Sequence, residues 1–84
     1  MSYFVYILEC SDKSLYTGIT TDLAKRLDQH NTSPKGAKYT KARRPVKLLY
    51  SEASENRSTA SKREYFIKKL TREKKLQLIQ TDML

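Results

Sequence analysis

Apolar residues gather in three short runs along the chain, and each run predicts a strand. Residues 3–10, YFVYILEC, are aromatic and aliphatic almost without interruption, as in a buried strand. After the polar residues 11–13 comes a shorter run, LYTGI at residues 15–19, and the two runs are expected to form a hairpin. The third run is VKLLYSEA at residues 46–53. The first strand is the most apolar, so we expect it to lie between the other two.

Between the hairpin and the third strand, the apolar positions change to helical spacing. Leu23 and Leu27 mark one face of a helix predicted for residues 22–31, DLAKRLDQHN, with Thr21 as its expected N-cap. Residues 33–45, SPKGAKYTKARRP, have Pro and Gly early and Pro late, and they predict a long basic loop.

Two further helices are predicted after the third strand. The first covers residues 55–70, ENRSTASKREYFIKKL, and the second covers residues 71–80, TREKKLQLIQ. Thr71 is expected to start the second helix, with Leu76 and Ile79 facing inward. The element order is therefore ββαβαα, which predicts a small α+β domain with helices covering the sheet.

One polar residue interrupts the apolar face of the helix at residues 55–70. Ala60, Ile67 and Leu70 fall on one face at helical spacing, and Glu64 lies on the same stripe. A carboxylate in an apolar environment lowers stability unless a partner compensates for it. The structural explanation is a partly buried ion pair, with Arg26 as the candidate partner. The alternative is that Glu64 has a chemical function.

Length and composition limit the kind of protein. Eighty-four residues without a Pro-rich or Gly/Ser-rich linker are expected to form one domain, residues 1–84. The one cysteine, Cys10, cannot form an internal disulfide, and no Cys/His spacing suits zinc. The N-terminal apolar run is too short for a membrane span and has no basic region before it. We therefore expect a cytoplasmic protein without a signal peptide.

Positive charge is the strongest feature of the composition. Seventeen Lys and Arg residues against nine Asp and Glu residues give a net charge of +8. Thirteen of the 17 cations lie in residues 35–47 and 62–75. Scattered cations would indicate only a solvated surface, but two concentrated stretches favour a polyanionic partner. Neither stretch has a strong apolar face, which favours a nucleic acid over a membrane.

The register of the predicted hairpin decides where two tyrosines point. A three-residue turn at residues 11–13 places Tyr6 opposite Gly18 and leaves room above the sheet for a ligand. The same register places Tyr16 opposite Leu8, so both tyrosines lie on one face. A register shifted by one residue would place them on opposite faces. Taken singly, each tyrosine also fits a packing role.

Two basic residues on the first predicted helix belong to the same region. Arg26 and His30 are four residues apart, so they project together at the edge of the Leu23 and Leu27 stripe. A lone histidine on a helix is often structural, and a lone arginine is often an ordinary surface charge. Next to the two tyrosines, a catalytic role is the alternative for His30.

The remaining acids do not form a metal-binding cluster. A two-metal nuclease needs several carboxylates close together. Asp12 belongs to the predicted turn, Asp22 to a helix start, and Glu52 is expected to be solvated. Glu64 is therefore the one carboxylate whose position requires a special explanation.

Together, these residues resemble the GIY-YIG nuclease superfamily, and in particular its short, stand-alone bacterial members. The likeness covers residues 3–80 and rests on Phe4-Val5-Tyr6, Tyr16-Thr17-Gly18, Arg26, His30 and Glu64. The chain departs from the family pattern where Phe4-Val5 replace Gly-Ile and where Thr17 replaces Ile. Many members also have an asparagine after the glutamate, and no Asn follows Glu64 here.

The resemblance implies both a fold and a reaction. The family fold is a three-stranded antiparallel sheet flanked by helices, and its members hydrolyse DNA phosphodiester bonds with one divalent cation, usually Mg²⁺, with Mn²⁺ as an alternative. Carried over by motif, Glu64 binds the metal and Arg26 holds the scissile phosphate. Tyr6 and Tyr16 position or deprotonate the attacking water, and His30 assists them.

Two classes of function remain open, a metal-dependent endonuclease and a nucleic-acid-binding module with the same fold but no useful turnover. In both cases the partner is DNA, with RNA as an alternative, and the preferred nucleic-acid structure and the oligomeric state stay open. The residues expected to contact nucleic acid are Gly18, Lys35, Lys38, Lys41, Arg43 and Arg44.

Overall fold

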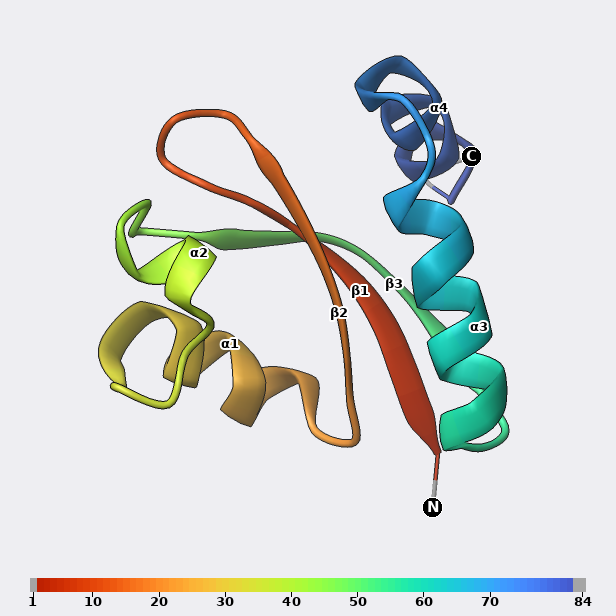
Figure 1. Ribbon diagram of the computed structural model, residues 1–84, viewed down its shortest axis with the longest axis horizontal. Helices are drawn as coiled ribbons and strands as arrows, with labels where there is room; N and C mark the ends of the chain where they lie inside the picture. The colour runs from red at the N-terminus through yellow and green to blue at the C-terminus, as the bar shows by residue number, and fades with distance from the viewer. Residues whose placement is uncertain (1, 83–84) are drawn as a thin grey trace.

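The computed structural model describes residues 2–82, and it has a central sheet with helices on both faces (Figure 1). The elements are β1 (Tyr3–Glu9), β2 (Leu15–Thr20), α1 (Leu23–Thr32), α2 (Lys38–Lys41), β3 (Lys47–Ser54), α3 (Arg57–Lys68) and α4 (Arg72–Asp82). The strands are antiparallel in the order β2-β1-β3, which confirms that the first strand is central. No helix within residues 2–82 has the length and apolar content needed to cross a membrane.

The β1–β2 hairpin has the register that the sequence predicts. The backbone N–H of Cys10 donates to the carbonyl of Ser14 at 2.9 Å and closes a turn over the three residues between them. Tyr6 therefore lies opposite Gly18, and Leu8 lies opposite Tyr16. Both tyrosines point to the same face of the sheet, because paired residues of neighbouring strands share a face.

Alternate residues of β1 enter two separate hydrophobic layers. The layer that includes α3 and α4 consists of Val5, Ile7, Tyr50, Ala60, Ile67 and Ile79. The layer that includes α1 consists of Tyr6, Leu8, Cys10 and Val46, with Tyr16, Leu23 and Leu27 packed against it. In Figure 1, α1 and α2 accordingly lie on one side of the sheet and α3 on the other. The two candidate tyrosines belong to the side covered by α1.

The start of α1 differs from the prediction by one residue. The N-cap is Asp22, whose carboxylate accepts a hydrogen bond from the backbone N–H of Lys25 at 3.1 Å. The prediction of Thr21 as the N-cap was wrong, because the helix begins one residue later and the Asp22 carboxylate reaches an N–H group of its first turn. The carboxylate also interacts favourably with the positive end of the helix dipole.

Residues 33–45 are not entirely loop, since they contain the short helix α2. Arg44 fixes this segment to the last turn of α1 by donating hydrogen bonds to the carbonyls of Gln29, His30 and Ser33. The carbonyls of Gln29 and Ser33 also accept from the backbone N–H groups of Ser33 and Gly36, and a cation near a helix C-terminus is favoured by the dipole. The segment that was predicted as an irregular loop is therefore attached to α1.

At the C-terminal end, one of the two predicted inward residues is wrong. Thr71 starts α4 as expected, since its hydroxyl accepts from the backbone N–H of Lys74 at 3.2 Å. Ile79 is buried as predicted, but Leu76 is 36 % exposed. Leu78 packs against the core instead, so the apolar face of α4 is offset from the predicted one.

Candidate active site

Tyr6, the first tyrosine of the candidate site, is almost completely buried, with 2 % of its surface exposed. Its side chain crosses the neighbouring strand at Gly18, where an added Cβ atom would lie 2.5 Å from the hydroxyl oxygen. Gly18 therefore makes room for the Tyr6 side chain itself, and the space that was expected for a ligand is occupied by the phenol. The contact between Gly18 and nucleic acid stays a prediction.

A chain of hydrogen bonds connects Tyr6 to the segment that follows α1. The Tyr6 hydroxyl lies 2.8 Å from Nε2 of His30, and Nδ1 of His30 lies 2.8 Å from the hydroxyl of Thr40. The Thr40 hydroxyl in turn donates to the carbonyl of Ala37 at 2.9 Å. His30 and Thr40 are both fully buried. The chain therefore runs inward from the phenol through the imidazole to the backbone.

The last of these bonds determines the direction of the others. Thr40 has one hydroxyl proton, and this proton is directed to the carbonyl of Ala37. The Thr40 oxygen consequently accepts a hydrogen bond from Nδ1 of His30, which places the proton of the neutral ring on Nδ1. Nε2 is then an acceptor, and the Tyr6 hydroxyl donates to it. This arrangement prepares His30 to receive a proton from Tyr6.

Burial keeps both members of this pair neutral. It raises the pKa of Tyr6 to about 12, against the opposing effect of the Arg26 guanidinium. It also lowers the pKa of His30 to about 4, and the charges of Arg26 and Arg44 act in the same direction. At neutral pH the proton between the two groups therefore stays on Tyr6.

Tyr16, the second tyrosine, is half-buried among other aromatic rings. Its ring centre lies 5.3 Å from that of His30 and 6.0 Å from that of Tyr39, on which it stacks. Within residues 2–82, its hydroxyl makes no hydrogen bond that would hold it in place. The ring is thus fixed by packing, while the hydroxyl is available to water or to a phosphate oxygen.

Arg26 lies beside Tyr6, as its spacing from His30 predicts. Both side chains line a gap between α1 and the sheet that has no room for a water molecule. One terminal nitrogen of the guanidinium donates to the side-chain oxygen of Gln29 at 2.9 Å and to the carbonyl of Lys35 at 3.1 Å. The other N–H groups make no hydrogen bond to the described residues, so they are available to an anionic oxygen.

Glu64 approaches this group from the other side of the sheet. Its neighbours Ala60 and Ile67 pack on the opposite face from Tyr6, but α3 also contacts the edge strand β2, over which the Tyr6 hydroxyl lies. Among the charges around Tyr6, that of Glu64 adds to the dominant effect of burial in raising the pKa of the phenol. The Glu64 side chain is 23 % exposed and pairs with Lys68 at 3.5 Å. Its ion-pair partner is therefore Lys68 and not Arg26.

The fit of a divalent cation can be judged from the carboxylates present. Residues 2–82 contain no group of three or more His, Cys, Asp or Glu side chains that could surround a metal ion. Glu64 alone is near the tyrosines, and Lys68, its half-exposed partner, can turn away. Mg²⁺ commonly keeps several water ligands and binds through one or two carboxylates together with substrate phosphates. The residues therefore fit a cation that Glu64 and the substrate would hold jointly.

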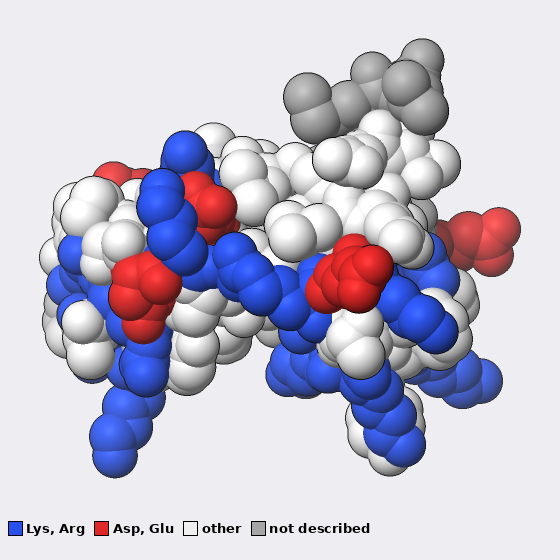
Figure 2. Space-filling model, turned by 90° about the horizontal axis from the view of Figure 1, so that it is seen from above, with Lys and Arg blue, Asp and Glu red and all other residues white. Residues whose placement is uncertain are grey.

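The lysines expected to contact nucleic acid are exposed. Lys35 precedes α2, and Lys38 and Lys41 are the first and last residues of this helix, which also contains Thr40. In Figure 2, Lys and Arg side chains project along the lower edge of the view from both halves of the molecule. The contacts of these lysines with nucleic acid stay predictions. Their exposed positive charges are of the kind that phosphate contacts require.

Arg43 has structural contacts as well. Its Nε donates to a carboxylate oxygen of Asp12 at 3.1 Å, and its guanidinium carbon lies 3.9 Å from the ring centre of Tyr39. Its carbonyl accepts from the backbone N–H of Ser11. Arg43 therefore connects the segment around α2 to the hairpin turn. The predicted roles of Arg43 and Arg44 in nucleic-acid binding are not excluded by these contacts, but both arginines already hold the fold.

Two residues of the site were missed by sequence reasoning. Thr40 orients His30, yet nothing in the sequence connects a threonine in a basic segment with a histidine ten residues earlier. Tyr39 stacks on Tyr16 and is 40 % exposed. An aromatic residue between lysines is a recognisable signal for a contact with nucleic acid, and Tyr39 was the one such signal in residues 35–47.

Glu52 is not solvated, contrary to expectation. Its carboxylate accepts from Nε of Arg63 at 2.8 Å and from the hydroxyl of Tyr50, and its side chain is 23 % exposed. Burial, together with this carboxylate, raises the pKa of Tyr50 to about 12. The network lies on the α3 side of the sheet, and it stabilises the fold rather than the candidate site.

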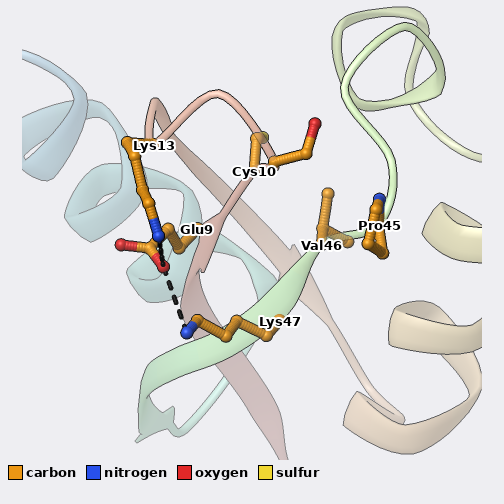
Figure 3. A pocket seen from close by; sticks show the side chains of 7 residues that line it. Glu9, Cys10, Lys13, Pro45, Val46 and Lys47 are labelled. Carbon is orange, nitrogen blue, oxygen red and sulfur yellow. Dashed lines mark ion pairs between the residues drawn. The ribbon is translucent and has the colours of Figure 1, made fainter.

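A hollow of about 220 Å³ lies elsewhere, beside the hairpin turn (Figure 3). Glu9 forms ion pairs there with Lys47 at 3.3 Å and with Lys13 at 3.9 Å, and Cys10 and Val46 form the apolar part of the wall. None of the candidate catalytic residues lines it. The site is therefore a set of converging side chains that is separate from this hollow.

Comparison with known proteins identifies the class to which this small α+β domain belongs. The model of the GIY-YIG catalytic domain matches residues 2–77, so the chain belongs to the GIY-YIG family. A UPF0213 protein of Clostridium perfringens is 60 % identical over 76 residues, which cover 90 % of this chain and 81 % of that protein.

Two solved structures have the same fold. The solution NMR structure of a UPF0213 protein from Bacillus halodurans is 47 % identical, with a TM-score of 0.62 over 96 % of this chain and 85 % of that chain. The solution NMR structure of a protein from E. faecalis is 45 % identical, with a TM-score of 0.67 over 99 % of this chain and 88 % of that chain.

Proposed function

We propose that this protein is a metal-dependent endonuclease that hydrolyses phosphodiester bonds of DNA. The observation that carries the proposal is the hydrogen-bond chain from Tyr6 through His30 to Thr40, with its proton direction fixed. The hydrogen bond places a neutral imidazole nitrogen where it can accept the phenol proton. Arg26, whose charge acts on both Tyr6 and His30, supplies positive charge where a phosphate would bind.

In the proposed reaction, Arg26 holds the scissile phosphate with its free N–H groups. The planar guanidinium binds two phosphate oxygens at once and stabilises the negative charge that grows on them during attack. The Tyr16 hydroxyl, which has no partner among the described residues, donates to a phosphate oxygen or to the attacking water. Lys35, Lys38 and Lys41 contact the neighbouring phosphates.

Tyr6 and His30 move the proton of the attacking water. The phenol oxygen accepts a proton from the water as its own proton passes to Nε2 of His30, and the water oxygen forms a bond to phosphorus. The bond from phosphorus to the leaving oxygen breaks, and the leaving oxygen takes a proton from the solvent. In the free protein the raised pKa of Tyr6 and the lowered pKa of His30 oppose this transfer. The attacking water must therefore be made more acidic for this transfer to occur.

A divalent cation held by Glu64 would lower the pKa of water near it and so favour loss of the proton. This role accounts for a carboxylate that lies beside an apolar stripe with only a half-exposed lysine as its partner. Removal of the Glu64 carboxylate should therefore abolish cleavage and leave DNA binding nearly unchanged.

A second candidate function is a nucleic-acid-binding module of the same fold without useful turnover. The observation that favours it is the pKa of Tyr6 of about 12, which makes the phenol a weak acid in the free protein. The basic surface around α2 would serve such a module equally well.

The decisive experiment is cleavage of labelled DNA by the wild type and by Tyr6→Phe, with Mg²⁺, with Mn²⁺ and with EDTA. We expect cleavage only with a metal, and a rate lower by about 10²- to 10⁴-fold in Tyr6→Phe, the range for losing a general acid or base. Tyr3→Phe is the matched control, since Tyr3 packs on the other face of the sheet, and its rate should equal that of the wild type. Binding without any metal-dependent cleavage would favour the binding module.

A further inference from the structure

The outer face of α3 carries two adjacent aromatic side chains in solvent. Tyr65 is 63 % exposed and Phe66 is 54 % exposed, the highest values among the exposed large hydrophobic residues of the described chain. Ala60 and Ile67 of the same helix are fully buried, so the aromatic pair lies on the face that points away from the core. Neighbouring rings left in water contribute nothing to the core, and they indicate a contact surface.

Cations surround these two rings. Nζ of Lys69 lies 4.3 Å from the ring centre of Tyr65, and the guanidinium carbon of Arg63 lies 5.4 Å from that of Phe66. Lys62 is exposed one helical turn before Tyr65. Neither Lys62 nor Lys69 forms an ion pair within residues 2–82. The face is therefore both aromatic and cationic, with charge that no neighbouring acid neutralises.

We propose that this face, which we call the α3 surface (Lys62, Tyr65, Phe66 and Lys69), binds a nucleic-acid strand with unpaired bases. Aromatic rings stack on bases, and the lysines beside them pair with the phosphates that connect those bases. A second copy of this chain carries the same net charge of +8 and is repelled. A helix that lies on a membrane has a broad apolar face, whereas here two rings stand among lysines.

The α3 surface belongs to the helix that also contributes to the candidate active site. Glu64, the proposed metal-binding residue, directly precedes Tyr65 in the chain and is the one acid between Arg57 and Lys68. Because consecutive side chains of a helix point in different directions, a strand on the rings would reach the Glu64 carboxylate around the edge of α3. This inference rests on the proposed function and deepens it, because it names strands with unpaired bases as the substrate class.

The test measures binding without cleavage, using fluorescence anisotropy of a labelled oligothymidylate in EDTA. Stacking of one base contributes about 1–3 kcal/mol, so Tyr65→Ala should weaken binding by about 5- to 150-fold. Tyr65→Phe keeps the ring and should bind within about twofold of the wild type. Leu76→Ala is the matched control, since Leu76 is an exposed apolar residue on another helix, and it should bind like the wild type.

The outcomes separate this inference from the proposed function. Wild-type affinity in Tyr65→Ala, or equal losses in Tyr65→Ala and Leu76→Ala, would overturn the α3 surface even if DNA is cleaved. The α3 surface would also be overturned if Tyr65→Ala loses binding to anionic phospholipid vesicles while its affinity for the oligonucleotide is unchanged. That result would indicate that the face binds a membrane. A selective loss of oligonucleotide affinity in Tyr65→Ala supports the α3 surface even if the wild type fails to cleave with Mg²⁺.

Discussion

At the scale of single residues, the site depends on partners that hold reactive groups in a neutral state. His30 is fully buried, and a buried imidazole needs a partner for each ring nitrogen. Tyr6 and Thr40 provide these partners. The contact with Thr40 could not be predicted from spacing, because the sequence does not reveal the path of the segment that contains Thr40. The i, i+4 spacing of Arg26 and His30, in contrast, was sufficient to predict that they share a site.

Thr40 is expected to act by orienting His30. Thr40→Val keeps the shape but removes the acceptor for Nδ1–H, so the neutral ring loses its fixed proton position. We expect DNA cleavage to fall by about 10- to 100-fold, as when a partner that orients a metal-binding histidine is lost. Thr40→Ser restores the hydroxyl and should restore most of the rate. Because His30 is the one histidine of the chain, NMR of its ring nitrogens reports the change directly.

That NMR measurement also tests the prediction independently of activity. In the wild type and Thr40→Ser, the nitrogen shifts should show a single neutral form with the proton on Nδ1. In Thr40→Val they should show a mixture of the two neutral forms. An unchanged spectrum in Thr40→Val together with a lower rate would mean that Thr40 affects the reaction by another route.

Replacement of Glu64 should abolish activity without lowering the stability of the metal-free protein. Its partner Lys68 is half-exposed, and such pairs contribute about 0–1 kcal/mol. Glu64→Gln should therefore leave the metal-free melting temperature unchanged or slightly higher, while cleavage is almost abolished and DNA affinity stays within a few-fold of the wild type. Mg²⁺ should raise the melting temperature of the wild type more than that of the variant.

The control for this comparison is Glu73→Gln, which removes an exposed acid at the start of α4 and should cleave normally. A Glu64→Gln protein that cleaves DNA at the normal rate but melts well below the wild type would identify the carboxylate as a structural ion-pair partner. The assignment of Glu64 as the metal-binding residue would then be wrong.

At the scale of elements, hydrophobic runs predicted the strands and polar segments were less informative. The register of the β1–β2 hairpin followed from one assumption about a three-residue turn, because each strand residue has only two faces to choose from. The segment between α1 and β3 lacked such a pattern. Its path depends on Arg43 and Arg44, whose contacts lie far away in the sequence, and charged residues of this kind are indistinguishable from solvated ones until the fold is known.

The cations of that segment should therefore fall into two groups. Arg44→Gln removes donors to three carbonyls at the end of α1 and should lower the free energy of unfolding by about 1–3 kcal/mol.

The double variant Lys38→Gln, Lys41→Gln removes two exposed charges and should unfold like the wild type. Its DNA binding should weaken, and each lost phosphate contact should reduce the log–log salt slope by about one. Thermal melts and binding titrations at several salt concentrations test both statements.

If the double variant keeps the wild-type salt slope, Lys38 and Lys41 do not contact phosphates. If Arg44→Gln melts like the wild type and loses DNA affinity instead, Arg44 belongs to the binding surface, as the sequence first indicated. The two results are independent of each other because the residues are tested in separate proteins.

At the scale of the whole molecule, the two faces of the sheet differ in composition, and the candidate catalytic chain lies on one of them. The face covered by α3 contains the larger apolar layer, and the face covered by α1 contains the buried polar chain. The sequence predicted the order of the strands and the shared face of the tyrosines. It did not predict that Glu64 would approach from the other side of the sheet, because helical spacing describes a stripe and does not say which edge of the sheet the stripe meets.

Burial of His30 should make the stability of the whole fold depend on pH in a defined window. The pKa of His30 is lowered to about 4, while that of an unfolded histidine is about 6.5, so the unfolded chain takes up a proton first as the pH falls. Above about pH 7.5 both states are neutral and His30 adds no pH dependence. Between about 6.5 and 5, the free energy of unfolding should decrease by about 1.4 kcal/mol per pH unit at most.

Chemical denaturation at several pH values measures this slope, and the window above pH 5 avoids the range in which most carboxylates titrate. His30→Gln has no titrating group at this position, so its free energy of unfolding should be nearly constant over the same window, although lower overall. Titration of the single histidine by NMR in the folded wild type should give a midpoint close to 4. A midpoint near 6.5 would mean that the imidazole is accessible to solvent, and the buried proton acceptor on which the proposed reaction depends would not exist.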